Sequence, residues 1–336
     1  MIALLEVNLV PSQKTFETNG QLYKFTPQNP VINMKFGKVE SADSINFDLP
    51  PIAAGTRQLL QKREQTDTPQ IYIGCPIWGN KNWVGTLYPR KTPTGEYLKH
   101  YAQQFNTIEL NSTHYSLPNN DTINKWKTQA SPGFKFCPKV PQDISHKLMP
   151  AGKASDFTQV FAQTMEGLSD YLGTTFMQLS PYFSPQDVAH LQRYLANFPQ
   201  HIPLAVEFRH ADWFKAGHFE NAAQLLEQHH VATVITDVAG RRDVLHQRLT
   251  TPTLVLRFVG NNLHPTDYTR IDAWVARIQE LISLGLQSAY LFIHQPDENE
   301  ATPELILYLI RALNKTCGLD LKAPQIYRPP VQGTLF

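Results

Sequence analysis

The sequence is poor in cysteine, and its charges nearly cancel. The three cysteines, Cys75, Cys137 and Cys317, are an odd number and show no CxxC spacing. This argues against a disulfide framework and fits a reducing compartment. The 30 lysines and arginines face 29 aspartates and glutamates, so no overall charge points to nucleic acid or an anionic membrane as a partner. Any bound anion must be held by a local cluster of cationic side chains.

Long apolar runs are also absent. The N-terminal stretch MIALLEVNLV is apolar, but it contains Glu6 and lacks both a basic region and a small-residue cleavage pattern. It is therefore a poor signal peptide. No later apolar run approaches the ~20 residues of a membrane-spanning helix. We predict a cytoplasmic protein without a membrane partner.

From Ile71 onward, short β-branched or aromatic runs alternate with helical patterns, which is typical of βα units and a parallel sheet. Helices are expected at 95–105, 154–172, 185–198 and 268–285, and Thr302 is expected to cap a last helix. The expected strands span residues 71–75, 107–111, 134–139, 175–179, 204–209, 233–237, 254–260 and 290–295.

This rhythm predicts an α/β protein, a single-domain (β/α)8 TIM-type barrel with an N-terminal extension, because such barrels need about 250 residues. An open doubly wound sheet is the alternative, but GCPIWGNKNW after the first strand is not a glycine-rich phosphate turn. The expected division is a poorly ordered leader at 1–33, an approach segment at 34–70, the barrel at 71–325 and a tail at 326–336. Met34 is a candidate translation start.

Polar side chains end most of the expected strands. Side chains alternate across a strand, so Glu109 shares a face with Asn111, and Glu207 shares one with Arg209. Unpaired buried polar groups cost about 1–3 kcal/mol each, so these residues must satisfy one another or hold a ligand. We expect a pocket at the C-terminal mouth of the barrel, built around Glu109, Glu207, Arg209, Asp237, Arg257 and His294.

Candidate roles follow from side-chain chemistry. Carboxylates and imidazoles can carry protons or bind Zn²⁺, Mn²⁺ or Mg²⁺, although no HxxxH or HxH motif is present. Arginines can clamp phosphate or carboxylate, and aromatic rings can stack on a substrate or simply seal the barrel. The candidate catalytic residues are Glu109, Glu207, Asp237, His294 and His146. The candidate substrate-binding residues are Asn111, Tyr115, Lys139, Gln178, Arg209, Arg241, Arg242, Arg257, Trp78 and Trp213.

The segments GCPIWGNKNWVGTLYP, FNTIELNSTHYSLP, GFKFCPKVPQDISH, VEFRHADWF and ITDVAGRRD together resemble the YecE-like family, domain of unknown function 72. The resemblance runs from about residue 36 to the C-terminus and implies a TIM-barrel fold without naming a reaction. Thr113 and His114 stand where the family often has threonine and phenylalanine before the tyrosine, and GCPIW stands where it usually has GTSGW. The family's signature residues correspond here to Trp78, Glu109, Asn111, Tyr115, Lys139, His146, Gln178, Glu207, Arg209, His210, Trp213 and Asp237.

The chain ends in PPVQGTLF. Gln332, Leu335 and Phe336 match the Q-x-x-L-F peptide by which bacterial repair and replication proteins dock on the DNA sliding clamp. The two apolar residues would fill a pocket and Gln332 would be a polar anchor. Alternatively, Leu335 and Phe336 pack back onto the barrel.

Three functions are compatible with these residues. The favoured one is an enzyme, a phosphodiesterase-like hydrolase, acting on an anionic phosphate-containing substrate that includes nucleic acid. The second is a non-catalytic DNA- or metabolite-binding protein recruited through its tail. The third is a sugar-processing hydrolase, for which Glu109 and Glu207 would have to lie about 5–10 Å apart and be free of arginine partners.

Overall fold

The computed structural model describes residues 14–18, 21–25, 37, 39, 41–61, 68–296 and 301–327. The chain divides into two units, residues 1–36 and 37–336. In the first unit, β1 (Lys14–Thr18) pairs antiparallel with β2 (Gln21–Phe25). The rest of the expected leader lies outside the described residues, as does the predicted clamp motif at 332–336.

The second unit contains a six-stranded parallel sheet. Strands β4 (Thr107–Leu110) and β5 (Lys135–Pro138) form a further parallel pair. Every strand expected from the sequence is present, which confirms the α/β class with parallel strands. In spatial order, the six strands are β3 (Gln70–Gly74), β10 (Ser288–His294), β9 (Thr253–Val259), β8 (Ala232–Asp237), β7 (Leu204–Glu207) and β6 (Thr175–Gln178).

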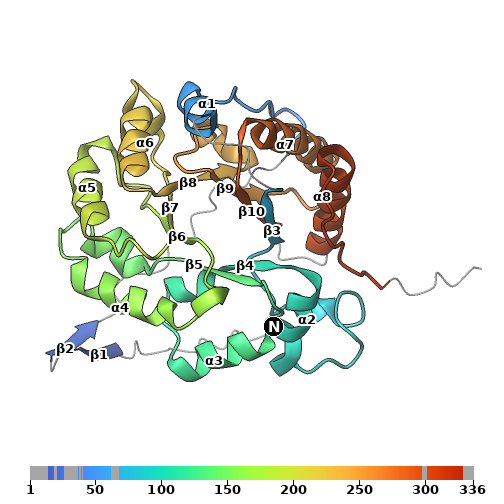
Figure 1. Cartoon of the computed structure of the whole chain (residues 1–336), viewed down its shortest axis with the longest axis horizontal. Helices are drawn as coiled ribbons and strands as arrows, with labels where there is room; N and C mark the ends of the chain where they lie inside the picture. Colours follow the sequence, from blue (N-terminus) through green and yellow to red (C-terminus); the bar gives the residue numbers. More distant parts are fainter. Residues whose placement is uncertain are drawn as a thin grey trace, which may run out of the picture. The chain divides into compact units, whose positions relative to one another are not determined.

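Backbone hydrogen bonds connect the two-stranded pair to both edges of the larger sheet. The Glu109 N–H donates to the Cys75 carbonyl at 3.3 Å, beside the end of β3. On the other side, the Val140 N–H donates to the Phe176 carbonyl of β6 at 2.9 Å. Figure 1 accordingly shows β4 and β5 between β3 and β6. The C-terminal ends of all these strands therefore face one region.

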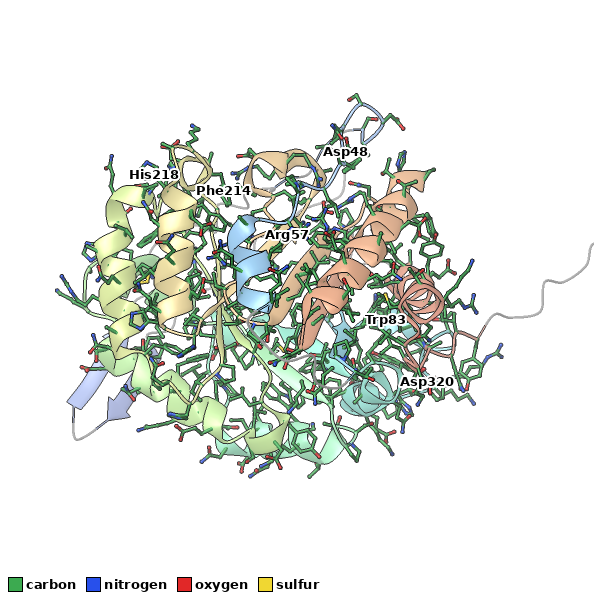
Figure 2. All side chains as sticks on the ribbon, turned by 45° about the horizontal axis from the view of Figure 1, so that its top comes forward. Asp48, Arg57, Trp83, Phe214, His218 and Asp320 are labelled. Carbon is green, nitrogen blue, oxygen red and sulfur yellow. The ribbon has the colours of Figure 1, made fainter. Side chains whose placement is uncertain are left out.

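Helices lie outside the strands in the second unit (Figure 1). Two expectations about their ends were wrong: α8 begins at Thr302 with Ala301 as its N-cap, and α4 ends at Glu166 instead of extending to residue 172. The approach segment contributes α1, on which Arg57 (Figure 2) pairs with Glu280 of α7 at 2.6 Å. The helices are α1 (Ala54–Gln61), α2 (Tyr97–Gln104), α3 (Asn120–Gln129), α4 (Ser155–Glu166), α5 (Val188–Asn197), α6 (His218–Gln228), α7 (Pro265–Leu284) and α8 (Thr302–Cys317).

The parallel strands lie between two apolar clusters, because alternate side chains point to opposite faces. The larger cluster packs between strands and helices and includes Trp83, labelled in Figure 2. The smaller one lies on the other face of the strands, where Tyr72 stacks on Tyr290 with ring centroids 4.7 Å apart. It contains Phe176 and Phe292 near the C-terminal ends of β6 and β10. The polar network described below lies on this same face of the strands.

Gly74 gives a test of how closely β3 approaches β4. An added Cβ would overlap the Thr107 carbonyl and lie 2.8 Å from the Tyr101 hydroxyl. We expect Gly74→Ala to lower the free energy of unfolding by about 1–3 kcal/mol, as overpacking does. Gly79→Ala is the matched control, because its Cβ would meet nothing within 4 Å. Urea unfolding of both variants measures the difference, and equal stabilities would contradict the close approach.

Candidate functional site

The polar network at the C-terminal ends of the strands is centred on Arg257. Its Nε and Nη2 donate to Oε2 and Oε1 of Glu109, both at 2.9 Å. Its Nη1 donates to Glu207 Oε2 at 3.0 Å. Paired charge-assisted bonds of this kind are among the stronger hydrogen bonds in proteins. One buried guanidinium thus joins β4, β7 and β9.

Glu109 has two further donors. Asn111 Nδ2 donates to Oε1 at 2.9 Å, and His294 Nε2 donates to Oε2 at 2.8 Å. Burial alone would raise the pKa of Glu109, but Arg257 and His294 together hold it well below its usual value. Glu109 is therefore an ionised carboxylate at neutral pH and a poor general acid.

Glu207 is saturated in a similar way. Arg209 Nε and Thr236 Oγ1 donate to its Oε1, both at 2.9 Å, and Gln178 Nε2 donates to its Oε2 at 3.1 Å. Burial opposes ionisation, but Arg209 and Arg257 lower the pKa of Glu207 to about 2. Neither carboxylate has the raised pKa that general acid catalysis needs.

Lys139 follows β5 directly and points into the same network. Its Nζ donates to Gln178 Oε1 at 3.0 Å and lies 5.8 Å from the centre of the Phe176 ring. In the part of the chain that is described, no carboxylate lies within ion-pair distance of this amine. Burial, reinforced by the nearby charge of Arg257, lowers the pKa of Lys139 to about 7.

Two histidines border Lys139. The rings of His114 and His146 meet edge to face at 5.7 Å. His114 Nδ1 donates to the Val140 carbonyl at 2.8 Å, and His146 Nδ1 shares a 2.8 Å hydrogen bond with the Ser145 hydroxyl. Burial, with a contribution from Lys139, lowers the pKa of His114 to about 3 and that of His146 to about 4. Both rings are neutral at pH 7.

Asp237 does not belong to this network, and its predicted place in the pocket was wrong. The inner cluster contains Val234, and Thr236, on the same face of β8, contacts Glu207. Asp237 therefore faces the helices. There it accepts from Trp274 Nε1 at 2.6 Å and from Arg270 Nη2 at 2.8 Å.

Arg242 belongs to the Asp237 cluster and not to the Arg257 network, so it does not lie where its predicted role in substrate binding requires. Its Nη1 pairs with Asp237, and its Nη2 donates to the Phe47 carbonyl at 3.1 Å. The neighbouring Arg241 lies differently: its Nη2 donates to the Arg209 carbonyl at 2.9 Å while its Nε binds Asp243. Arg241 thus holds the backbone beside the site.

The predicted tryptophans are packing residues. Trp213 is 1% exposed, donates from Nε1 to the Phe183 carbonyl at 2.8 Å and packs edge-on against Phe208. Trp78 packs edge-on against Trp126 of α3 at 5.9 Å. Both rings therefore contact other protein groups.

The exposed aromatic rings come from the loops instead. Tyr115, after β4, is 70% exposed, and Tyr182, after β6, is 75% exposed. Tyr182 was missed by sequence analysis, as were His114 and Thr236. No sequence signal marks Thr236, because polar and apolar residues do not alternate along β8, and nothing in the sequence distinguishes Tyr182 from other loop tyrosines.

The acidic residues of this site do not fit a resident metal centre. Within the described ranges, no group of three or more histidine, cysteine, aspartate or glutamate side chains is placed to hold a metal ion. Glu109 and Glu207 are bound by guanidinium groups instead. The Zn²⁺, Mn²⁺ or Mg²⁺ site considered from sequence therefore has no matching ligand set here.

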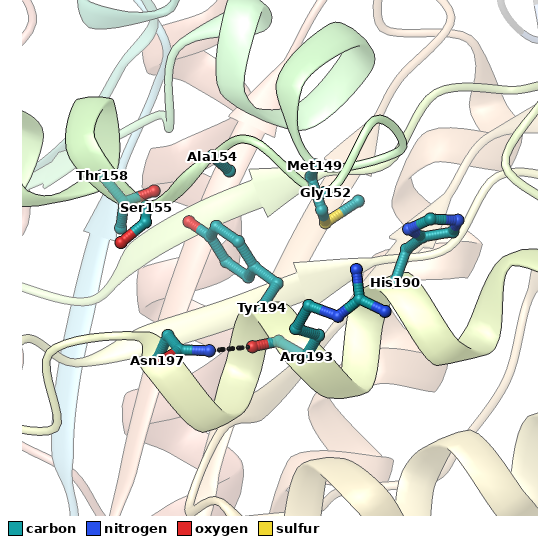
Figure 3. A pocket seen from close by; sticks show the side chains of 9 residues that line it. All are labelled: Met149, Gly152, Ala154, Ser155, Thr158, His190, Arg193, Tyr194 and Asn197. Atoms are coloured by element: carbon teal, nitrogen blue, oxygen red, sulfur yellow. Dashed lines mark hydrogen bonds between the residues drawn. The ribbon is translucent and has the colours of Figure 1, made fainter.

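Two cavities lie apart from the network. One of about 60 Å³ lies between α4 and α5 (Figure 3), where it is lined by Thr158, His190 and Tyr194 among others. A space of that size accommodates a few water molecules. The other, of about 300 Å³, borders Ile71 and Phe105 at the N-terminal ends of β3 and β4. Neither is the predicted pocket.

Parallel strands with a charged network at their C-terminal ends define an α/β protein with a candidate ligand site. The chain belongs to the family described as "Protein of unknown function DUF72", whose model matches residues 72–327. This confirms the resemblance drawn from the motifs. The chain is 30% identical over 285 residues to the UPF0759 protein YecE of Escherichia coli (strain K12), covering 79% of this chain and 100% of YecE. The UPF0759 protein YunF of Bacillus subtilis (strain 168) is 26% identical over 164 residues, 47% of this chain and 57% of YunF.

Solved structures of the family are similar in fold. A DUF72 family protein from Thermotoga maritima MSB8 superposes with a TM-score of 0.58 at 23% identity, covering 74% of this chain and 100% of that one. One from Enterococcus faecalis V583 has a TM-score of 0.57 at 18% identity, covering 75% and 99%. Among the described residues, no helix is long and apolar enough to cross a membrane.

The bridge made by Arg257 can be tested by removing it. In Arg257→Met, Glu109 and Glu207 remain buried without their shared partner, so we expect the free energy of unfolding to fall by about 3–5 kcal/mol. Arg57→Gln is the control: its ion pair is exposed on both sides (44% and 41%), and such pairs contribute ~0–1 kcal/mol. Urea unfolding compares the two. A loss for Arg257→Met as small as that of the control would show that the network is not a stabilising bridge.

Proposed function

We propose that this protein is an enzyme that acts on an anionic, phosphate-containing substrate at the C-terminal ends of its parallel strands. The observation that carries the proposal is Lys139, a buried amine that lacks a carboxylate partner among the described residues and lies near Arg209 and Arg257. Both carboxylates of the site are already saturated by donors. An incoming anion would supply the missing negative charge.

We also propose that the eight parallel strands, β3 to β10, close into a (β/α)8 barrel. The hydrogen bonds from Glu109 to Cys75 and from Val140 to Phe176 support closure. Active sites of such barrels lie at the C-terminal ends of the strands. The network occupies this position.

Hydrolysis of a phosphodiester, including nucleic acid, is the form of this activity that we favour. Tyr115 and Tyr182 expose rings on which bases can stack. Sugar hydrolysis is disfavoured, because it requires one carboxyl with a raised pKa and a second free of arginine partners. Glu109 and Glu207 both have lowered pKa values and both bind Arg257.

The proposal predicts anion binding that depends on Arg209. Inorganic phosphate and pyrophosphate should bind the wild-type protein, and Arg209→Gln should weaken binding about 10-fold or more, since a hydrogen bond to a charged group contributes about 1.5–3 kcal/mol. Isothermal titration calorimetry measures this. The control is Arg193→Gln, because Arg193 is exposed and lines the separate α4–α5 cavity. If only the control variant loses binding, the anion does not bind at the strand ends and the proposed location is wrong.

A second candidate function is recruitment to DNA as a binding protein, which the tail motif favours. Gln332, Leu335 and Phe336 have the spacing of clamp-binding peptides. We expect the full-length protein to bind a bacterial DNA sliding clamp with a micromolar Kd, and a variant carrying Leu335→Ala and Phe336→Ala to lose binding because its apolar anchors are removed. Calorimetry measures both proteins. Absence of heat at high micromolar concentrations of the wild type would remove this candidate.

A further inference from the structure

Lys139 differs from exposed lysines whose partners are clear. Lys147 binds Asp143 and Lys215 binds Asp212, each at 2.7 Å, and both lysine side chains are more than half exposed. Lys139 is 8% exposed, and its side chain donates a hydrogen bond to the neutral amide oxygen of Gln178. Its alkyl chain ends over the apolar ring of Phe176.

Burial is the main factor that disfavours an ammonium ion at Lys139. Arg257 and Arg209 also repel it, while Glu109 and Glu207 attract it, and the pKa of Lys139 is lowered to about 7. Desolvation and neighbouring cations are the two conditions that activate a lysine amine as a nucleophile. Lys139 is therefore more readily deprotonated at neutral pH than an exposed lysine.

We propose that Lys139 is a nucleophilic amine that forms a Schiff base with the carbonyl group of a phosphorylated aldehyde or ketone. This rests on the proposed function, since the phosphate group would be held by the cationic side chains of the same site. The proposal narrows the substrate class from any phosphate-containing anion to one that also carries a carbonyl group.

The covalent step balances without any oxidant or reductant. The lone pair of Lys139 Nζ forms a bond to the carbonyl carbon, and the C=O π electrons move to oxygen, which takes up a proton from solvent. The resulting hydroxyl group leaves with one proton of the nitrogen as water while the nitrogen lone pair forms the C=N bond, so the products are the protonated Schiff base and one water molecule. His146 is neutral, and Lys139 is among the charges that act on it. It is a group able to exchange protons during these transfers.

Two sources offer this chemistry. One is a free sugar phosphate in its open-chain aldehyde form. The other is an abasic site in DNA, whose open deoxyribose has an aldehyde between two phosphates. The structure supports the shared chemistry, a carbonyl close to phosphate, and the two sources are separated by experiment.

The test is reductive trapping on the full-length protein. Wild-type protein is incubated at pH 7 with D-glyceraldehyde 3-phosphate and sodium cyanoborohydride, and the labelled lysines are located by peptide mass spectrometry. We expect Lys139 to be labelled at least about 10-fold faster than Lys147 and Lys215 in the same digest, because a lysine of ordinary pKa near 10.4 is almost entirely protonated at pH 7. The labelling rate at Lys139 should rise with pH and level off above about pH 7. Labelling of Lys139 no faster than these two lysines overturns the proposal.

Two variants separate this inference from the proposed function. Lys139→Arg keeps a positive charge but cannot form the iminium bond, so it should yield no adduct at position 139. Arg209→Gln should bind phosphate weakly, yet its Lys139 should still react with non-phosphorylated D-glyceraldehyde. If the wild type binds phosphate without preferential labelling of Lys139, the Schiff base is refuted and anion binding stands. If preferential labelling occurs without phosphate binding, the anionic substrate is refuted and the reactive amine stands.

A final experiment identifies the source of the carbonyl group. An oligonucleotide with a single abasic site is mixed with the protein and sodium borohydride, and covalent complexes are separated on a denaturing gel. A complex formed by the wild type and absent with Lys139→Arg assigns the carbonyl to DNA. Trapping of the free sugar phosphate alone assigns it to a small metabolite. Trapping of neither overturns the proposal.

Discussion

The strand-end site depends on one interaction, the bridge from Arg257 to Glu109 and Glu207. Each of the three charges would be strongly unfavourable in this position alone, because burial removes its hydration. Together they are satisfied at 2.9–3.0 Å. The bridge fixes the side chains of β4, β7 and β9 relative to one another, and Asn111, Gln178, Thr236 and His294 orient themselves around its carboxylate oxygens. Removing one of these three charges leaves another charge buried without a partner, which destabilises the fold.

The same bridge determines which residue is left for chemistry. With both carboxylates held ionised by guanidinium groups, neither Glu109 nor Glu207 is suited to give up a proton. Arg257 and Arg209 oppose the attraction of these carboxylates for the Lys139 ammonium group, and burial lowers the pKa of Lys139 further. The site is a preformed set of donors and cations around one buried amine, and the proposed binding of an anion would need little reorganisation of it.

The strands, and the shared faces of Glu109 with Asn111 and Glu207 with Arg209, could be predicted because apolar alternation specifies both. The face of Asp237 could not. All of β8 is buried, so its sequence does not distinguish a polar, solvent-facing side from an apolar, core-facing side. A shift of one residue therefore reverses which face each side chain is assigned to. Arg241 and Arg242 are adjacent in a loop without periodicity, and only tertiary contacts separate their roles. Tyr182 was missed for the same reason: exposure in a loop has no sequence pattern.

Among the described residues, Asp237 and Arg257 each lie at the centre of a buried ionic cluster, and the surroundings of these two clusters differ. Around Asp237, the Arg270 side chain is 1% exposed, Trp274 closes another side, and Arg242 ties the cluster to the segment near Phe47. Every charged group there contacts other protein groups, as expected of an ionic cluster that holds β8 against α7. Exposure does not separate the two clusters, because Arg242 retains 19% exposure, and Arg209 and His294 retain 15% and 14%. The difference lies in Lys139 beside Arg257, a buried amine without a carboxylate partner among the described residues. Buried ion pairs stabilise a fold less efficiently than apolar packing of the same volume, so a cluster that leaves a buried cation without a counter-charge is better explained by ligand binding than by stability.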